Sequence, residues 1–569
     1  MKPLISRLLQ TRLRLPEIPG RPVDPDAPLL FGFNRERDEI ITGVADRLVH
    51  RYRGLPPERL LYTLNEAANA ELRRLTLQRD GEAEAELDGW KKLARKVGGM
   101  SHSRRLKTMH RISARIAADV AGNFDPRVYR LVLQVVPGLL TGIMTPADLP
   151  LELVRSGWSQ LDRRLSVEGP VAKLRRLARL GTLILVPTHS SNLDSIALGY
   201  SLAREGLPPV VYGAGKNLFS NPLISFFMHN LGAYRVDRRI QAPLYKEVLK
   251  GFSFEVIRRG YHSLFFPGGT RSRAGVVERH LKLGLAGTAV EAFAHNQVSG
   301  HPRPVFFVPV TINYGLVLEA ETLIEDHLKG EGQGRYIITD DEFSRVGRLV
   351  AFFNKLTRLR SAAVIRFSEP FDPFCNPVDD LGRSLGPGGH KLDPGTYVRR
   401  HGAPVIDAAR DAGYTRELGE LLPRVYARET VIMWTQLVAH VLYRHLVQST
   451  PGRDLWNRHR VHDVTMPRDQ LIAACGHARD RLLALEAEGQ IRVDPTVRCE
   501  LPERIVADAL DAWSGYHTTT VVSERDGAVQ LVDPNLLLYY QNRLVGLAEE
   551  LATEDTLAAA RRITEEVSR

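Results

Sequence analysis

From about residue 170 onward, short runs of apolar residues alternate with amphipathic stretches, and this alternation restricts the possible folds more than any other feature of the chain. Short apolar runs bounded by turn residues are typical of buried strands, whereas apolar positions three or four apart are typical of helices. Strands that alternate with helices favour an α/β fold with a largely parallel sheet. We expect strands at residues 182–186, 209–212, 262–266, 305–310 and 362–367.

The sequence on either side of this region is predicted to be mainly helical, apart from a hairpin near residues 518–532. A stretch rich in Pro and Gly, residues 371–395, is typical of a loop or a linker. We therefore divide the chain into four parts: an N-terminal mainly helical region (1–165), an α/β domain (166–375), a connecting segment (376–420) and a C-terminal mainly helical domain (421–569).

The chain carries 77 Lys and Arg residues against 66 Asp and Glu residues, a formal net charge of +11. This excess favours anionic partners such as lipid headgroups, phosphorylated metabolites or nucleic acid, without choosing among them. No apolar run reaches the roughly 18–20 residues of a membrane-spanning helix, so we expect any membrane contact to be lateral and shallow. The basic stretch 90–115 fits either a solvated helix face or a contact with anionic lipids.

His189 and Asp194 lie five positions apart in the segment LILVPTHSSNLDSIAL, directly after a predicted strand. The carboxyl end of a strand that runs into a helix is where α/β proteins bind ligands. A histidine in this place can take a proton from a hydroxyl, while a neighbouring carboxylate fixes its tautomer. Taken alone, the pair is better explained as a structural hydrogen bond in a loop, because the spacing also occurs by chance.

Two further segments carry positive charge after predicted strands. FFPGGTRSRAG contains a tight glycine turn followed by Arg271 and Arg273, which share one side of an extended segment. The planar guanidinium suits phosphate oxygens, and a basic surface turn is the alternative. Lys216 and Arg238 flank the apolar stretch 218–231, which is either ordinary core or a surface for an acyl chain or a membrane.

Taken together, the blocks resemble the glycerolipid acyltransferase superfamily in order and spacing. Its HxxxxD block is matched by His189 and Asp194, and its fourth block by Pro309 in an apolar strand. The second and third blocks are matched by two sets: Gly232, Tyr234 and Arg238, then Phe266, Gly269, Thr270, Arg271, Ser272 and Arg273. Residues 430–446 and 536–547 are similar to C-terminal segments of the large glycerol-3-phosphate and dihydroxyacetone-phosphate acyltransferases.

The resemblance implies a mostly parallel α/β core with helices on both faces, flanked by N- and C-terminal helical regions. It implies transfer of an acyl group from acyl-CoA or acyl-carrier protein to a glycerol phosphate or lysolipid acceptor, with no metal or redox cofactor. The protein would work at the cytoplasmic face of a membrane, in contact with anionic lipids. His189 would be the general base and Asp194 its orienting carboxylate. The substrate-binding residues would be Lys216, Arg238, Gly269, Thr270, Arg271, Ser272 and Arg273.

Gly268 departs from the family pattern, which carries an acidic residue at this position of the third block. This change is consistent with an altered acceptor preference or with a non-catalytic lipid-binding relative. The acceptor also stays open among glycerol 3-phosphate, lysophosphatidate and dihydroxyacetone phosphate. Nucleic-acid binding is disfavoured, because the apolar residues of the helical stretch 466–494 fit helix packing.

Overall fold

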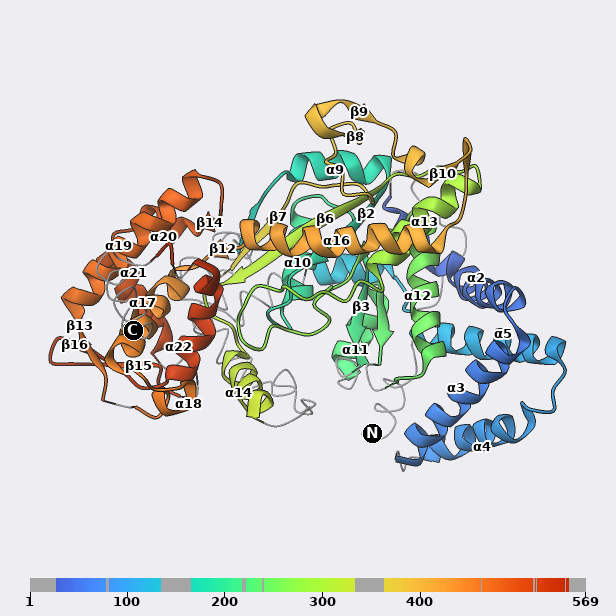
Figure 1. Cartoon of the computed structure of the whole chain (residues 1–569), viewed down its shortest axis with the longest axis horizontal. Coiled ribbons are helices and arrows are strands. Elements are labelled where there is room, and N and C mark those ends of the chain that lie inside the picture. The colour runs from blue at the N-terminus through green and yellow to red at the C-terminus, as the bar shows by residue number, and fades with distance from the viewer. Residues whose placement is uncertain are drawn as a thin grey trace, which may run out of the picture.

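The computed structural model of the protein describes residues 27–77, 81–134, 165–216, 222–237, 240–332, 363–461, 463–514, 517, 519–547 and 549–551. Within these residues, a seven-stranded sheet in the order β1-β7-β6-β2-β5-β3-β4 lies at the centre of the molecule (Figure 1). Its strands are β1 (Leu165–Glu168), β2 (Thr182–Pro187), β3 (Val211–Gly215), β4 (Ala233–Val236), β5 (Ser263–Leu264), β6 (Val305–Tyr314) and β7 (Ala363–Phe367). The neighbours from β6 to β4 pair in parallel, and β7 pairs with β6 in the antiparallel direction.

The predicted α/β class is therefore confirmed, and the five predicted strands are present with shifted ends. β1 and β4 were not predicted, because each is only four residues long and carries polar side chains, LSVE and AYRV. Every residue of β2 is buried. Successive strand side chains point to opposite faces, so a strand covered on both faces is apolar throughout.

Different helices cover the two faces of the sheet. From β2, Leu183 and Leu185 enter one hydrophobic core, while Ile184 and Val186 enter another. The first core includes residues of α9 (Val171–Leu180), α10 (Asp194–Arg204) and α14 (Ala320–Gly332). The second includes residues of α12 (Pro243–Arg258), α13 (Ala286–Val298) and α16 (Ala408–Glu429).

The N-terminal helices pack against α12 at one side of the sheet (Figure 1). They follow the short η1 (Leu29–Gly32) and are α2 (Phe33–Arg53), α3 (Pro57–Leu77), α4 (Gly81–Lys96) and α5 (His102–Val120). The buried Arg37 donates hydrogen bonds to the carbonyls of Ala118, Ala121 and Gly122. Since the last carbonyls of a helix have no partner within the helix, these bonds close the end of α5 and tie it to α2.

The connecting segment and the C-terminal part follow β7. The connecting segment contains β8 (Ser384–Leu385), η4 (Pro387–Gly389), β9 (Lys391–Leu392), η5 (Pro394–Val398), β10 (Arg399–Arg400) and β11 (Ala403–Pro404).

The C-terminal part lies on the side of the sheet away from the N-terminal helices (Figure 1). It contains β12 (Val431–Ile432), α17 (Trp434–Ser449), α18 (Leu455–Arg458), β13 (Thr465–Pro467), α19 (Arg468–Ala487), β14 (Arg492–Val493), α20 (Pro495–Cys499), α21 (Pro502–Trp513), β15 (Val522–Arg525), β16 (Ala528–Leu531), α22 (Pro534–Gln541) and η6 (Asn542–Leu547). The hairpin predicted near residues 518–532 is confirmed as β15 and β16. The three boundaries between the four predicted parts stay predictions; α16 runs through the one at residue 420.

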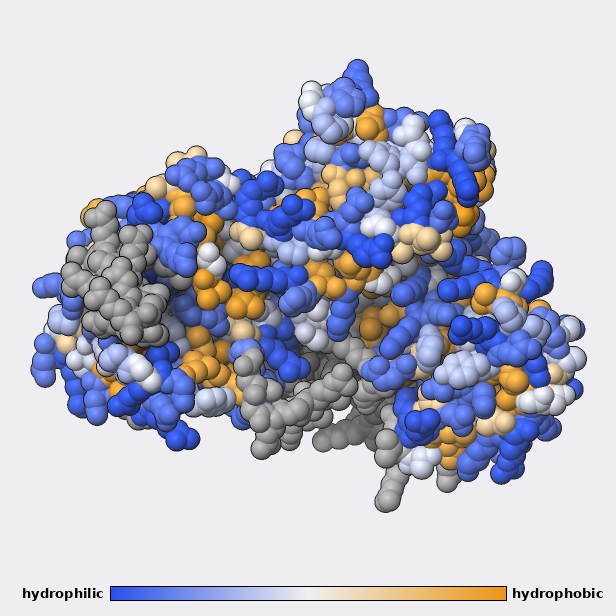
Figure 2. Space-filling view, in the orientation of Figure 1, coloured by the Kyte–Doolittle hydropathy of each residue, from blue (hydrophilic) through white to orange (hydrophobic). Residues whose placement is uncertain are grey.

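Within the described residues, no helix combines the length and apolar character needed to cross a bilayer. The face in Figure 2 is mostly hydrophilic, and its hydrophobic residues form small scattered groups.

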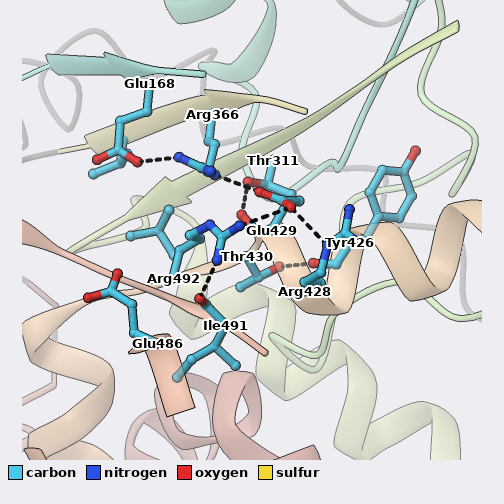
Figure 3. Close-up of polar contacts among 12 residues, drawn as sticks. Glu168, Thr311, Arg366, Tyr426, Arg428, Glu429, Thr430, Glu486, Ile491 and Arg492 are labelled. Atoms are coloured by element: carbon cyan, nitrogen blue, oxygen red, sulfur yellow. Dashed lines mark hydrogen bonds and ion pairs between the residues drawn. The ribbon is translucent and has the colours of Figure 1, made fainter. Parts of the chain in front are cut away.

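A buried carboxylate connects the sheet to the C-terminal part (Figure 3). Glu429, at the end of α16, accepts hydrogen bonds from Arg366 of β7 at 2.7 Å and from Arg492 of β14 at 3.4 Å. Arg366 also donates to Glu168 of β1 at 2.9 Å. Burial alone would raise the pKa of Glu429, but the hydrogen bond and charge of Arg366, with the charge of Arg492, hold that pKa below its usual range.

We expect Glu429→Ala to lower the free energy of unfolding by about 2–3 kcal/mol at pH 7. Breaking a fully buried ion pair costs about 3–5 kcal/mol, and Arg366 is partly exposed. The folded-state pKa is depressed, so this contribution is present above the unfolded-state pKa and is lost as the pH falls below about 4. Urea unfolding at pH 7 and pH 3.5 measures both effects.

Arg428→Ala is the matched control, since Arg428 bonds the same carboxylate at 2.9 Å but is half exposed. This variant should lose less than about 1 kcal/mol of unfolding free energy. Equal losses in the two variants would contradict the assigned role.

Candidate active site

The loop between β2 and α10 carries His189 and is fixed by the neighbouring strand. Thr188, the first residue after β2, donates its backbone N–H to Val310 of β6 at 2.9 Å. Its hydroxyl accepts the N–H of Ile312 at 3.0 Å. These two bonds continue the β2–β6 pairing, which includes Val186 opposite Pro309. His189 therefore emerges from the carboxyl end of a central strand, the predicted place.

Asp194, the first residue of α10, is fully buried and binds His189 directly. One oxygen, Oδ2, lies 2.7 Å from His189 Nδ1 and also accepts the backbone N–H groups of Ser190 at 2.7 Å and Ser191 at 3.0 Å. The N-terminus of a helix favours a negative charge. With Nδ1 as the donor to Asp194, the His189 ring keeps its lone pair on Nε2. The side chain of His189 is 14% exposed, so this ring is accessible while its partner is not.

The loop after β5 lies against His189 and carries the arginine pair. The ring of Phe266 stacks on the His189 ring, with centroids 4.2 Å apart. Ser272 donates its backbone N–H to the His189 carbonyl at 2.8 Å. Since Arg271 and Arg273 are the chain neighbours of Ser272, the fold brings together the predicted histidine and the predicted arginines.

Arg271 is additionally anchored by Glu319, a buried residue that directly precedes α14. Glu319 Oε1 lies 3.2 Å from Arg271 Nη1 and accepts the Asn192 backbone N–H at 3.0 Å. Its other oxygen accepts the Ser191 hydroxyl at 2.8 Å. Burial raises the pKa of Glu319, and the charge of Arg271 acts against that rise. Glu319 thus joins the loop after β2 that carries His189 (the histidine loop) to the loop after β5 that carries Arg271 and Arg273 (the arginine loop). The sequence patterns did not predict Glu319.

The remaining predicted residues have different surroundings. Lys216 follows β3 and forms an ion pair with Asp237 at 3.1 Å. Arg238 lies outside the described residues. In the predicted apolar stretch, α11 (Pro222–Asn230) buries Met228, whereas Phe226 and Phe227 are half-buried, so both interpretations of that stretch stay open.

A glycine in the arginine loop admits a lysine that the sequence patterns did not single out. Gly269 has a φ of +75°, the left-handed region that favours glycine. A Cβ at this position would lie 2.9 Å from the ammonium nitrogen of Lys282, an exposed residue. Lys282 therefore adds a positive charge directly over the predicted phosphate loop.

The C-terminal segment also reaches the site. Arg543 donates to the Ser190 hydroxyl at 2.6 Å, and the Asn542 amide donates to the Ala274 carbonyl at 2.8 Å. A small pocket beside Ser190 is lined by residues from both parts of the chain: Tyr314, Gln436, Tyr539, Tyr540 and Arg543. The similarity of residues 536–547 to a family segment was the available signal, and it gave Arg543 no role.

The arginine loop and α22 approach so closely that Gly275 has no room for a side chain. Gly275 has a φ of +78°, and a Cβ there would lie 2.1 Å from the Tyr539 carbonyl oxygen. Gly275→Ala should lower the free energy of unfolding by about 2–4 kcal/mol, from backbone strain together with overpacking. Gly388→Ala is the matched control, because Gly388 has a φ of +79° with nothing within 4 Å of its Cβ position. Chemical denaturation measures the free energy of unfolding of both variants. Equal losses would show that the close approach of Tyr539 does not add to the cost of a side chain at position 275.

Comparison with known proteins relates one part of the chain to a protein family. The Acyltransferase family matches residues 170–313. The chain is similar to glycerol-3-phosphate acyltransferases of Aeromonas hydrophila (34% identity, 32% of this chain and 23% of the relative), Histophilus somni (30%, 37% and 24%) and Ectopseudomonas mendocina (32%, 39% and 25%). The chain thus spans about a quarter of the length of the curated relatives it matches.

Among solved structures, the 1-acyl-sn-glycerophosphate acyltransferase of Thermotoga maritima aligns with 52% of this chain and 92% of its own, at 15% identity and a TM-score of 0.25. The family match covers β2, β5, β6 and the loops that hold His189, Asp194 and the arginine pair. Residues 170–313 therefore match the Acyltransferase family, as the resemblance to the glycerolipid acyltransferase superfamily predicts.

Proposed function

We propose that the protein is an O-acyltransferase that moves a fatty acyl group from an acyl thioester to a hydroxyl of a glycerol phosphate acceptor. The observation that carries this proposal is the contact of the His189–Asp194 pair with the arginine loop, through the bond from Ser272 to the His189 carbonyl. A proton acceptor and a set of cations thereby lie on adjoining loops, as acylation of a phosphorylated alcohol requires.

In the proposed reaction, His189 Nε2 takes the proton of the acceptor hydroxyl as its oxygen attacks the thioester carbonyl. The new C–O bond replaces the C–S bond, and the imidazolium returns the proton to the departing thiolate. Asp194 holds the ring through Nδ1 and stabilises the imidazolium. Arg271, Arg273 and Lys216 are proposed to bind the acceptor phosphate, together with Gly269, Thr270, Ser272 and Arg238 in the predicted set.

Glycerol 3-phosphate is the proposed acceptor, because the relatives named above are glycerol-3-phosphate acyltransferases. The proposed donor is acyl-CoA or acyl-carrier protein, with no metal or redox cofactor. We propose a peripheral or monotopic position at the cytoplasmic face of a membrane. The exposed basic residues of α4 and α5 support contact with anionic lipids there; they are Lys91, Lys92, Arg95, Lys96, Arg104, Lys107, Arg111 and Arg115.

The direct test uses purified full-length chain, labelled glycerol 3-phosphate and a long-chain acyl thioester. His189→Ala should lower kcat by about 10²–10⁴-fold, the contribution of a positioned general base. Lysophosphatidate and dihydroxyacetone phosphate, assayed in parallel, identify the acceptor. Wild-type transfer no faster than that of His189→Ala, for every acceptor, would refute the enzymatic proposal. Intact liposome binding in that case would favour a non-catalytic lipid-binding protein.

Arg273 offers the cleaner test of phosphate binding. It has no hydrogen-bond or ion-pair partner among the described residues, whereas removing Arg271 would also leave the buried Glu319 without its cation. We expect Arg273→Gln to raise the acceptor KM by about 10–100-fold, the loss of a charge-assisted hydrogen bond, with a smaller change in the donor KM. Arg400→Gln, an exposed arginine of β10, is the control. An unchanged acceptor KM in Arg273→Gln would remove this residue from the phosphate site.

A further inference from the structure

The loop that follows β5 folds back on itself and returns a second acidic residue to the site. Lys282 donates its backbone N–H to the Pro267 carbonyl at 2.7 Å. The Ser272 hydroxyl donates to the Val276 carbonyl at 2.8 Å, which closes the turn at Gly275. As a result Glu278, ten positions further along the chain, lies beside Gly268.

The side chain of Glu278 fills the space that a side chain at position 268 would enter. A Cβ built on Gly268 would lie 3.2 Å from Glu278 Cγ and 3.6 Å from Glu278 Oε1. A glutamate oxygen is three bonds from its own Cβ, a reach of about 3.5 Å at ordinary bond lengths. A glutamate at position 268 could therefore place a carboxylate oxygen where Glu278 Oε1 now lies.

The same oxygen of Glu278 binds the residue that carries the proposed chemistry. Oε1 accepts the backbone N–H of His189 at 2.6 Å. The other oxygen, Oε2, is buried and has no hydrogen-bond partner among the described residues. Burial raises the pKa of Glu278, and the charge of Arg543 acts against that rise. Glu278 and Ser272 thus hold the two backbone polar groups of His189, since Glu278 accepts from its N–H and Ser272 donates to its carbonyl.

We propose that Glu278 is a positioning residue that holds the His189 loop through its backbone N–H and replaces the carboxylate that the family pattern places at position 268. This inference rests on the proposed acyl transfer and deepens it. The glycine at 268 and the glutamate at 278 form a compensating pair, because the space for one side chain is taken by the other. The departure at Gly268 is consequently no mark of a non-catalytic protein.

The test moves the carboxylate from one position to the other. Glu278→Ala should lower kcat about 100-fold, with an acceptor KM within about threefold of wild type, because the general base loses its position while the phosphate site remains. The double variant Gly268→Glu/Glu278→Ala should recover kcat at least about tenfold over Glu278→Ala, since it restores the acceptor for the His189 N–H. Glu278→Gln keeps an amide oxygen and should stay within about tenfold of wild type, as a neutral acceptor is weaker than a charged one.

Thermal unfolding of each variant separates positioning from a loss of fold, and Glu417→Gln, an exposed glutamate of α16, is the control. A folded double variant with kcat no higher than that of Glu278→Ala would overturn the proposal, as would wild-type kcat in Glu278→Ala. If Glu278→Ala does not fold, the folded double variant must instead reach about a tenth of wild-type kcat, and a lower value overturns the proposal. Absence of transfer by the wild type would count against the proposed function, whereas an active wild type with an unrescued double variant counts against Glu278 alone.

Discussion

The arrangement of the site depends on one buried oxygen, Asp194 Oδ2, which lies within hydrogen-bond distance of three nitrogens: His189 Nδ1 and the backbone nitrogens of Ser190 and Ser191. A buried carboxylate without such partners would cost several kcal/mol, so the loop must keep the shape that supplies them. Because two of the three donors belong to the backbone, that shape also sets the direction of the His189 ring. The orientation of the proposed base is therefore a property of the β2–α10 connection, and it does not rely on a single flexible side-chain contact.

The site is assembled from segments far apart in the chain, and part of it lies beyond the residues that match the acyltransferase family. The match ends at residue 313. Glu319, which joins Arg271 to the histidine loop, comes just after it. Asn542 and Arg543 come from the end of the described chain and bind Ala274 and Ser190. The C-terminal part is thus a wall of the site, which explains why Gly275 must admit the backbone of α22 at close range.

The sheet and the central pair could be predicted because both leave local signals. A strand buried on both faces is a continuous apolar run, and a polar pair directly after it marks the strand end where ligands bind. Glu278, Glu319 and Arg543 leave no such signal. Each is a single charged residue on a loop or a helix end, and its role arises from contacts between segments that no periodicity relates. Lys282 reaches the site for a similarly non-local reason, because Gly269 has no side chain in the space that Lys282 occupies.

The acids around His189 also explain why arginine, and not lysine, occupies position 271. Burial raises the pKa of both Glu278 and Glu319, and guanidinium groups, Arg543 for the first and Arg271 for the second, oppose that rise. An acceptor phosphate would also bind Arg271. This side chain must therefore hold the Glu319 carboxylate and still offer N–H donors to the ligand. A guanidinium carries five N–H donors in a rigid fork and can serve both, whereas the three donors of a lysine ammonium are spread around one point charge. Arginine at position 271 thereby suits the buried Glu319 as well as the proposed phosphate, and one side chain can serve both because Glu319 orients it.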